Sequence, residues 1–232
     1  MEKAIRFHQT GGPEVLKLEE VSVGEPGPGE VRLRHVAVGL NFADTYFRNG
    51  TYPIPLPAGM GVEAAGVVEA VGPGVTDFAV GDKVTYTGFL NTLGAYSTAR
   101  IIATAPLIKL PAGIACETAA AMTMRGLTSA YLMRRIHDFK AGDTILLHAA
   151  AGGVGLIVSQ WAKLLDLRVI GTVSTEEKAA VARAHGCDEI INYSHDDVAK
   201  RARELTGGVG VDVVFDSVGK STFMASLDSL KR

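Results

Sequence analysis

Short runs of alternating apolar and polar residues fill the first half of the chain. They lie at residues 31–38, 66–72 and 82–86, and residues 2–7 show the same two-residue period. Turns rich in glycine and proline separate these runs. Short strands at such spacing predict an antiparallel, barrel-like domain. Residues 49–61, which are rich in Gly and Pro, predict an irregular loop.

From about Cys116 the pattern changes to helices that alternate with short, continuously apolar strands. The expected strands are residues 144–149, 168–173, 189–192 and 211–216, and the expected helices include 154–165 and 176–185. This alternation predicts a parallel, doubly wound sheet, so the fold class is α/β. A complete dinucleotide-binding sheet has about six strands in two halves, and we expect the sheet here to be incomplete and the chain truncated.

A glycine-rich turn connects the first of these strands to its helix. Residues 149–155 read Ala-Ala-Ala-Gly-Gly-Val-Gly. Aligned to Gly-x-Gly-x-x-Gly, Ala150 replaces the first glycine, whereas Gly152 and Gly155 keep the other two. Gly152 lets backbone N–H groups approach a diphosphate at the helix N-terminus, and Gly155 lets the helix pack on the strand. A turn without a ligand is the alternative, and the strand and helix on either side favour the dinucleotide.

The end of the second parallel strand bears on the choice between NAD and NADP. NAD sites usually carry an acidic residue there, but this chain has Ser174, with Lys178 one helical turn later. A hydroxyl and an ammonium suit the 2′-phosphate of NADP, so NADPH is the expected cofactor. Ser174 and Glu177 also have the spacing of a capping box, which would occupy Glu177, and Glu176 has no evident role.

Residues 59–68, Gly-Met-Gly-Val-Glu-Ala-Ala-Gly-Val-Val, resemble the Gly-His-Glu-x-x-Gly signature of the medium-chain dehydrogenase/reductase superfamily. Val62 stands where the zinc-binding histidine would be, and Asn41 stands at the first cysteine ligand. Neither side chain suits zinc, and the cysteine lobe of a structural zinc is absent from the sequence. We therefore expect no metal.

Within that superfamily the chain is similar to the quinone oxidoreductase (zeta-crystallin-like) family. The similar stretches are residues 11–16, 39–46, 126–128, 148–155 and 216–219. The resemblance implies a GroES-like catalytic domain over residues 1–125 and an NADPH-binding Rossmann domain, lacking its last strands, over residues 126–232. It implies hydride transfer from NADPH to a quinone, a reaction of this family that can yield a semiquinone.

The resemblance also assigns site residues. On the substrate side it implies Asn41, Tyr46 and Tyr52, although each tyrosine is equally well explained as a packing ring. For the cofactor it implies Phe42, Asp44, Thr128, Tyr131, Gly152, Gly153, Val154, Gly155, Ser174, Lys178, Tyr193, Ser217 and Val218. His148 precedes the glycine turn, and we interpret it as a strand-end residue rather than a catalyst.

Composition limits the possible partners. Lys and Arg number 23 against 25 Asp and Glu, and this near-neutral balance argues against nucleic acid or an anionic membrane. Cys116 and Cys187 form neither a disulfide framework nor a metal-finger spacing. The N-terminus lacks the apolar core of a signal peptide, so we expect a cytoplasmic protein. The resemblance implies a homodimer for full-length members of the family.

Two other functions remain open on the sequence alone. The same hydride donor could reduce an enone or an enoyl thioester, because acceptor choice depends on the shape of the pocket. A non-catalytic, crystallin-like protein that holds NADPH is the third possibility.

Overall fold

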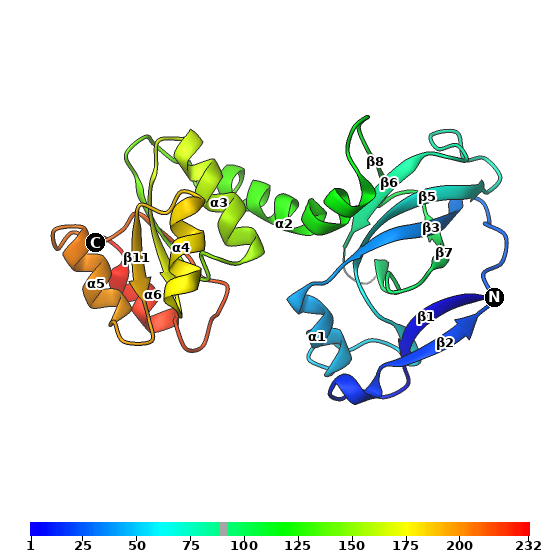
Figure 1. Cartoon of the computed structure of the whole chain (residues 1–232), viewed down its shortest axis with the longest axis horizontal. Helices are drawn as coiled ribbons and strands as arrows, with labels where there is room; N and C mark the ends of the chain where they lie inside the picture. Colours follow the sequence, from blue (N-terminus) through cyan, green and yellow to red (C-terminus); the bar gives the residue numbers. More distant parts are fainter. Residues whose placement is uncertain (89–91) are drawn as a thin grey trace. The chain divides into compact units, whose positions relative to one another are not determined.

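The computed structural model describes residues 1–88 and 92–232, and it divides into two compact units, Met1–Met124 and Arg125–Arg232 (Figure 1). Helix α2 (Cys116–Arg134) contributes residues to both units. Each unit is described by itself below.

Unit 1 is built on a five-stranded sheet of order β7-β3-β5-β6-β8 in which neighbouring strands are antiparallel. The strands are β3 (Glu30–Gly39), β5 (Glu63–Val71), β6 (Lys83–Thr87), β7 (Ala99–Ala103) and β8 (Ile108–Lys109). Alternate residues such as Val31, Leu33 and Val84 form its buried core, which explains the two-residue period of the sequence. The antiparallel architecture predicted for this half is confirmed.

A smaller sheet of order β2-β1-β4 completes unit 1. Its strands are β1 (Glu2–Phe7), β2 (Lys17–Val21) and β4 (Ala58–Gly59), with the short helices η1 (Pro13–Val15) and α1 (Phe42–Arg48) beside them. The expectation of an irregular loop over 49–61 was wrong for β4, which pairs with β1 at Phe7 and Arg6. Glycine and proline content gave no sign of this two-residue pairing.

Unit 2 has a parallel sheet of order β11-β10-β9-β12. The strands are β9 (Thr144–Leu147), β10 (Arg168–Val173), β11 (Glu189–Asn192) and β12 (Val213–Phe215), and the helices are α3 (Gly153–Leu164), α4 (Glu176–Ala184), α5 (Val198–Leu205) and α6 (Phe223–Ser229). The strand order reverses at β9, and the carboxyl ends of strands at such a switch point are where doubly wound sheets bind ligands. The predicted parallel sheet is confirmed.

Both faces of this sheet are buried, which explains why its strands are apolar without interruption. Ile145 and Val169 pack into a core on one face, whereas Leu146 and Ile170 pack into a core on the other. Strand β9 ends two residues earlier than predicted because Ala149 adopts a left-handed conformation, φ 52°, and begins the glycine turn.

Candidate active site

The turn between β9 and α3 presents backbone amides at the start of a helix. Gly152 is the N-cap of α3, and its own N–H donates to the Ala149 carbonyl oxygen at 2.8 Å. Gly153 and Val154 are the first helical residues, so their amides have no acceptor within the helix. Together with the helix dipole, these amides suit an anionic group.

Each of the three glycines in this turn is needed for a different structural reason. A Cβ on Gly155 would lie 2.6 Å from the carbonyl oxygens of Ala149 and Ala150, so only glycine lets α3 pack so closely. A Cβ on Gly153 would overlap the side chain of Arg125. A Cβ on Gly152 would have one close neighbour, the Ala149 oxygen at 3.0 Å, so the space beside Gly152 is open to a ligand.

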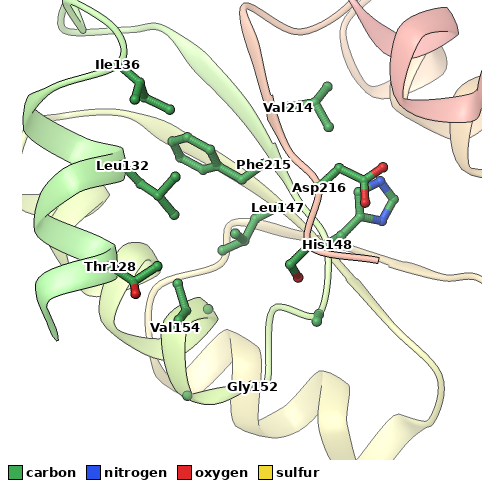
Figure 2. A pocket seen from close by; sticks show the side chains of 14 residues that line it. Thr128, Leu132, Ile136, Leu147, His148, Gly152, Val154, Val214, Phe215 and Asp216 are labelled. Carbon is green, nitrogen blue, oxygen red and sulfur yellow. The ribbon is translucent and has the colours of Figure 1, made fainter. Parts of the chain in front are cut away.

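A cavity of about 510 Å³ lies beside this turn, within unit 2 (Figure 2). One wall is formed by Thr128 and Leu132 of α2 and by Ile136, which follows α2. Another wall is formed by Gly152–Gly155. The carboxyl ends of β9 and β12 close it with Leu147, His148, Ala149, Val214, Phe215, Asp216 and Ser217. Aliphatic and aromatic groups therefore face a cavity whose rim carries backbone amides, which suits a ligand with an apolar ring and an anionic part.

A buried hydrogen-bonded network holds the β12 side of this cavity. Asp216 Oδ2 accepts from Ser226 Oγ at 2.7 Å, and Ser226 Oγ lies 3.1 Å from His148 Nε2. His148 Nδ1 lies 3.1 Å from Thr172 Oγ1. Because the serine hydrogen goes to Asp216, His148 donates from Nε2 and accepts at Nδ1. The serine is therefore not activated by the histidine, and the network serves to support the cavity.

The ionisation of this network follows from its burial and its donors. Burial lowers the pKa of His148, which keeps the imidazole neutral at physiological pH. Burial alone would raise the pKa of Asp216, but hydrogen bonds from Ser226, Gly219, Thr222 and Val218 outweigh it and lower that pKa. His148 directly follows β9, as expected of a strand-end residue.

A smaller hollow of about 190 Å³ adjoins the glycine turn at the end of β10 and is lined by Gly152, Ser174, Lys178 and Tyr193, among others. Lys178 Nζ donates to Ser174 Oγ at 3.0 Å, so the predicted ammonium and hydroxyl do lie together. Both are available to a second anionic group beside the first.

The capping interpretation of Ser174 was wrong. The N-cap of α4 is Thr175, whose hydroxyl accepts from the Lys178 amide at 3.3 Å. Ser174 directly follows β10, and the Ser174 side chain accepts from Lys178 Nζ instead of capping the helix. Thr175 therefore takes the N-cap position. Glu176 also has a partner that the sequence did not suggest, because Asn192 Nδ2 donates to its Oε1 at 3.2 Å.

In unit 1 the predicted residues gather at the start of α1. Asn41 is the N-cap, and its backbone N–H donates to Asp44 Oδ2 at 2.9 Å. Its side-chain Nδ2 donates to Glu63 Oε2 at 2.7 Å. Asp44 is 2% exposed, and the hydroxyl of Tyr96 donates to its Oδ2 at 2.7 Å. Within the described residues, Asp44 Oδ1 has no hydrogen-bond partner.

Three aromatic rings lie beside this group. Tyr46 packs edge-to-face on Phe42 and Tyr52, with ring centroids 5.5 and 5.3 Å apart. Phe42 is 76% exposed, so an aromatic side chain is presented to solvent or to a ligand. Tyr52 also packs on the buried Phe47, which makes it the more structural of the two tyrosines.

The structure therefore brings the predicted residues together in three groups. Asn41, Phe42, Asp44, Tyr46 and Tyr52 cluster in unit 1. Thr128, Gly152, Gly153, Val154, Gly155 and Ser217 line the larger cavity of unit 2, and Ser174, Lys178 and Tyr193 line the smaller hollow. Tyr131 and Val218, which are 59% and 54% exposed, line neither cavity in the described part of the chain.

Two acidic residues of these networks were not predicted from the sequence. Glu63 begins strand β5, directly before the apolar and glycine residues 64–68, and a carboxylate beside such a buried run was a usable signal for a polar network. Asp216 was assigned only as part of a family motif, although it follows a parallel strand at the edge where ligands bind. Arg125, which lies against Gly153, gave no signal because an arginine within a helix is ordinary.

Two absences can be stated for residues 1–88 and 92–232. They contain no group of three or more His, Cys, Asp or Glu side chains placed to hold a metal ion. They also contain no helix with the length and apolar character needed to span a bilayer. Val62 is fully buried, and the Asn41 side chain donates to Glu63.

Comparison with known families agrees with this architecture. Residues 27–112 match the family described as "Alcohol dehydrogenase GroES-like domain", and residues 153–232 match the one described as "Zinc-binding dehydrogenase". The first matched range lies within unit 1 and the second within unit 2.

Individual relatives narrow the assignment. A quinone oxidoreductase of Pseudomonas aeruginosa is 55% identical over 98% of this chain and 70% of its own length. A 2-haloacrylate reductase of a Burkholderia species is 51% identical over 100% of this chain and 71% of its own. The crystal structure of Escherichia coli quinone oxidoreductase complexed with NADPH superposes with a TM-score of 0.95 at 47% identity, covering 99% of this chain and 70% of that one. The chain therefore belongs to the quinone oxidoreductase family of the medium-chain dehydrogenase/reductase superfamily.

Proposed function

We propose that this protein is an NADPH-dependent quinone reductase that works without a metal. The observation that carries the proposal is the pairing of two anion sites in unit 2. The amides of the glycine turn and the Ser174–Lys178 pair line adjoining hollows, as a diphosphate and a 2′-phosphate require. The Escherichia coli relative, whose structure is an NADPH complex, supports the choice of nucleotide.

The residues of unit 2 fit this cofactor. The space beside Gly152 and the first amides of α3 would hold the diphosphate, and Ser174, Lys178 and Tyr193 would hold the 2′-phosphate end. Glu176, the acid closest in sequence, is engaged by Asn192. Thr128, Tyr131, Ser217 and Val218 are proposed for the nicotinamide and its ribose, with Phe42 and Asp44 from unit 1. Asp44 Oδ1, which has no hydrogen-bond partner among residues 1–88 and 92–232, suits a hydroxyl donor.

The protein's own chemical task is to orient reactants and stabilise negative charge. When bound, NADPH supplies a hydride to the quinone, and a proton from water completes the hydroquinone. Asn41, Tyr46 and Tyr52 are proposed as neutral donors to the quinone oxygen that gains charge. We accordingly propose residues 1–125 as the catalytic domain and residues 126–232 as the nucleotide-binding domain, in a cytoplasmic protein.

Steady-state kinetics test this function. The purified protein should oxidise NADPH in preference to NADH when 1,4-benzoquinone is the acceptor, which the near-ultraviolet absorbance of the reduced nucleotide can follow. Equal use of the two nucleotides would contradict the role given to Ser174 and Lys178. Binding of NADPH in calorimetry without oxidation by any acceptor would instead favour a non-catalytic, nucleotide-holding protein.

A second candidate is reduction of an activated carbon–carbon double bond, because the Burkholderia relative at 51% identity is a 2-haloacrylate reductase. The same hydride donor and the same donors to a developing oxyanion would serve this reaction. Comparing kcat/KM for 2-chloroacrylate, a 2-alkenal and 1,4-benzoquinone under matched conditions decides between the two acceptors.

A further inference from the structure

Glu63 is an ionisable residue in the middle of a sheet. It lies on β5, where its backbone pairs with Gly39 of β3 on one side and Thr87 of β6 on the other. The residue is 1% exposed. Burying a carboxylate is costly unless donors satisfy it, so its partners indicate what the residue does.

Both oxygens of Glu63 accept hydrogen bonds from neutral donors. Oε2 accepts from Asn41 Nδ2 at 2.7 Å, and Oε1 accepts from the Met124 backbone N–H at 2.6 Å. An ionised carboxylate can only accept, so it fixes the direction of the Asn41 amide, with the nitrogen toward Glu63. The Met124 contact at the same time ties the carboxylate to helix α2.

The sheet makes room for this carboxylate. A side chain on Gly39 would overlap Glu63 Oε2 and would lie 2.6 Å from the Ala120 carbonyl oxygen. Gly39 has no left-handed backbone conformation to explain it, so the glycine is needed for the space that it leaves. The slot for Glu63 is therefore part of the fold.

Asn41 is held from its other side as well. Asp44 accepts from its backbone N–H, and Tyr96 donates to the same carboxylate oxygen. Burial raises the pKa of Tyr96, and the charges of Asp44 and Glu63 raise it further, which keeps the phenol a donor. A neutral amide thus sits between two buried acids, one on its main chain and one on its side chain.

We propose that Glu63 is a positioning residue for the quinone reductase reaction. It orients the Asn41 amide, so that the remaining N–H of Nδ2 can donate to the acceptor oxygen that gains negative charge. The inference rests on the proposed function, since that function assigns Asn41 to the substrate.

A double-mutant cycle tests whether Glu63 acts through Asn41. In Glu63→Gln the new amide oxygen satisfies the Met124 N–H, and the new amide nitrogen cannot accept from Asn41 Nδ2, so the Asn41 amide must turn over. We expect kcat with benzoquinone to fall by about 100-fold, with the affinity for NADPH in calorimetry unchanged. In an Asn41→Ala background, Glu63→Gln should lower kcat no further. Multiplicative effects of the two substitutions would overturn the proposal.

Stability separates positioning from a merely structural role. Because the introduced glutamine keeps the Met124 contact and the size of the side chain, the thermal midpoint of Glu63→Gln should fall by less than about 8 °C. Glu204→Gln, on an exposed ion pair with Arg201 in unit 2, is the matched control for loss of one acidic charge, and its kcat should equal that of the wild type. If the fall in kcat of Glu63→Gln is fully accounted for by a smaller fraction of folded protein, the proposal is contradicted.

A second variant tests the contact without any activity measurement. Asn41→Asp would place a carboxylate against Glu63, so one of the two must bind a proton and the pKa of the pair rises. The folded state then binds a proton that the unfolded chain does not, so this variant should gain stability relative to the wild type as pH falls from about 8 to 5. Asp44 and Tyr96, the other titratable groups facing this amide, are the same in both proteins. If the stability of Asn41→Asp and that of the wild type change with pH in parallel, the contact on which the proposal depends is overturned.

These outcomes separate the inference from the proposed function. A wild-type protein that reduces neither quinone nor haloacrylate would overturn the proposed function and the catalytic role of Glu63 together. If the wild type is active and the effects of the two substitutions on kcat multiply, only the role of Glu63 is overturned.

Discussion

The two units present their polar groups in different ways. In unit 2, the groups that face the larger cavity at the start of α3 are backbone amides. Gly155 and Gly153 decide how closely helix, strand and arginine approach, and Gly152 leaves space for a ligand. In unit 1, the corresponding group is one side-chain amide held between two buried carboxylates. A site made of backbone depends on space, whereas a site made of side chains depends on protonation and on each partner. The two should therefore respond to different perturbations.

The largest effect should come from filling space at the backbone site. Gly155→Ala places a Cβ against two carbonyl oxygens that cannot move independently, so we expect a loss of at least ~3 kcal/mol in unfolding free energy. Urea unfolding followed by far-ultraviolet circular dichroism reports on both units, and the fluorescence of Trp161, the only tryptophan, reports on unit 2. Gly24→Ala, where a Cβ would meet nothing within 4 Å, should be nearly neutral. Equal losses in both variants would refute the packing argument.

A half-buried histidine should make unit 1 sensitive to pH. Burial lowers the pKa of His35 to about 4, and its ring nitrogens bond the Ser97 carbonyl and the Tyr86 hydroxyl. The unfolded chain binds a proton near pH 6.5 that the folded chain does not, so stability falls as pH drops from about 6.5 to 4. We expect about 2–3 kcal/mol of this loss to disappear in His35→Gln. Urea titrations at several pH values measure the unfolding free energy of both proteins. If it depends on pH in the same way in His35→Gln and in the wild type, His35 is not a neutral imidazole in the folded state.

The proposed preference for NADPH depends on the Lys178 ammonium group. Lys178→Ala removes the cation beside Ser174, so NADPH binding should weaken by about 2 kcal/mol, whereas NADH binding should change little. Isothermal titration calorimetry with both nucleotides measures this difference. Lys200→Ala, an exposed lysine on α5, is the control for overall charge. If both lysine variants lose the same affinity for NADPH, the effect is general electrostatics and not a specific contact.

The smallest effect should come from Asp216, a position where unit 2 resembles unit 1 in depending on a hydrogen-bonded acid. Hydrogen bonds lower its pKa, so its contribution to stability is complete above about pH 4 and is lost as pH falls further. Asp216→Asn should cost about 1 kcal/mol at neutral pH and should flatten the acid limb of the stability curve. Identical acid unfolding of the two proteins would exclude Asp216 as its cause.

What the sequence could predict follows the same division. The glycine turn is recognisable from the sequence alone because a backbone site needs glycines at fixed spacing between a strand and a helix. The family and both sheet types were predicted correctly for the same reason, since hydrophobic period and glycine motifs are local. The roles of the individual site residues stay predictions.

Side-chain networks were predicted less well because their partners are distant in sequence. Glu63 and Asn41 are 22 residues apart, and His148 and Ser226 are 78 apart. Nothing local distinguishes Ser174 from Thr175 as the cap of α4, and tertiary contacts decided between them. The two-residue strand β4 likewise depends on β1 and not on its own composition.

The hydrogen bonds accepted by Asp216 show that a solvent-exposed residue can belong to a well-held loop. Val218 is 54% exposed, yet its amide and that of Gly219 both donate to Asp216, which Thr222 and Ser226 also bind. A surface loop tethered at so many points to one acid moves as a single piece. Its amides should exchange with deuterium slowly, like those of an interior strand, although solvent reaches the side chain beside them.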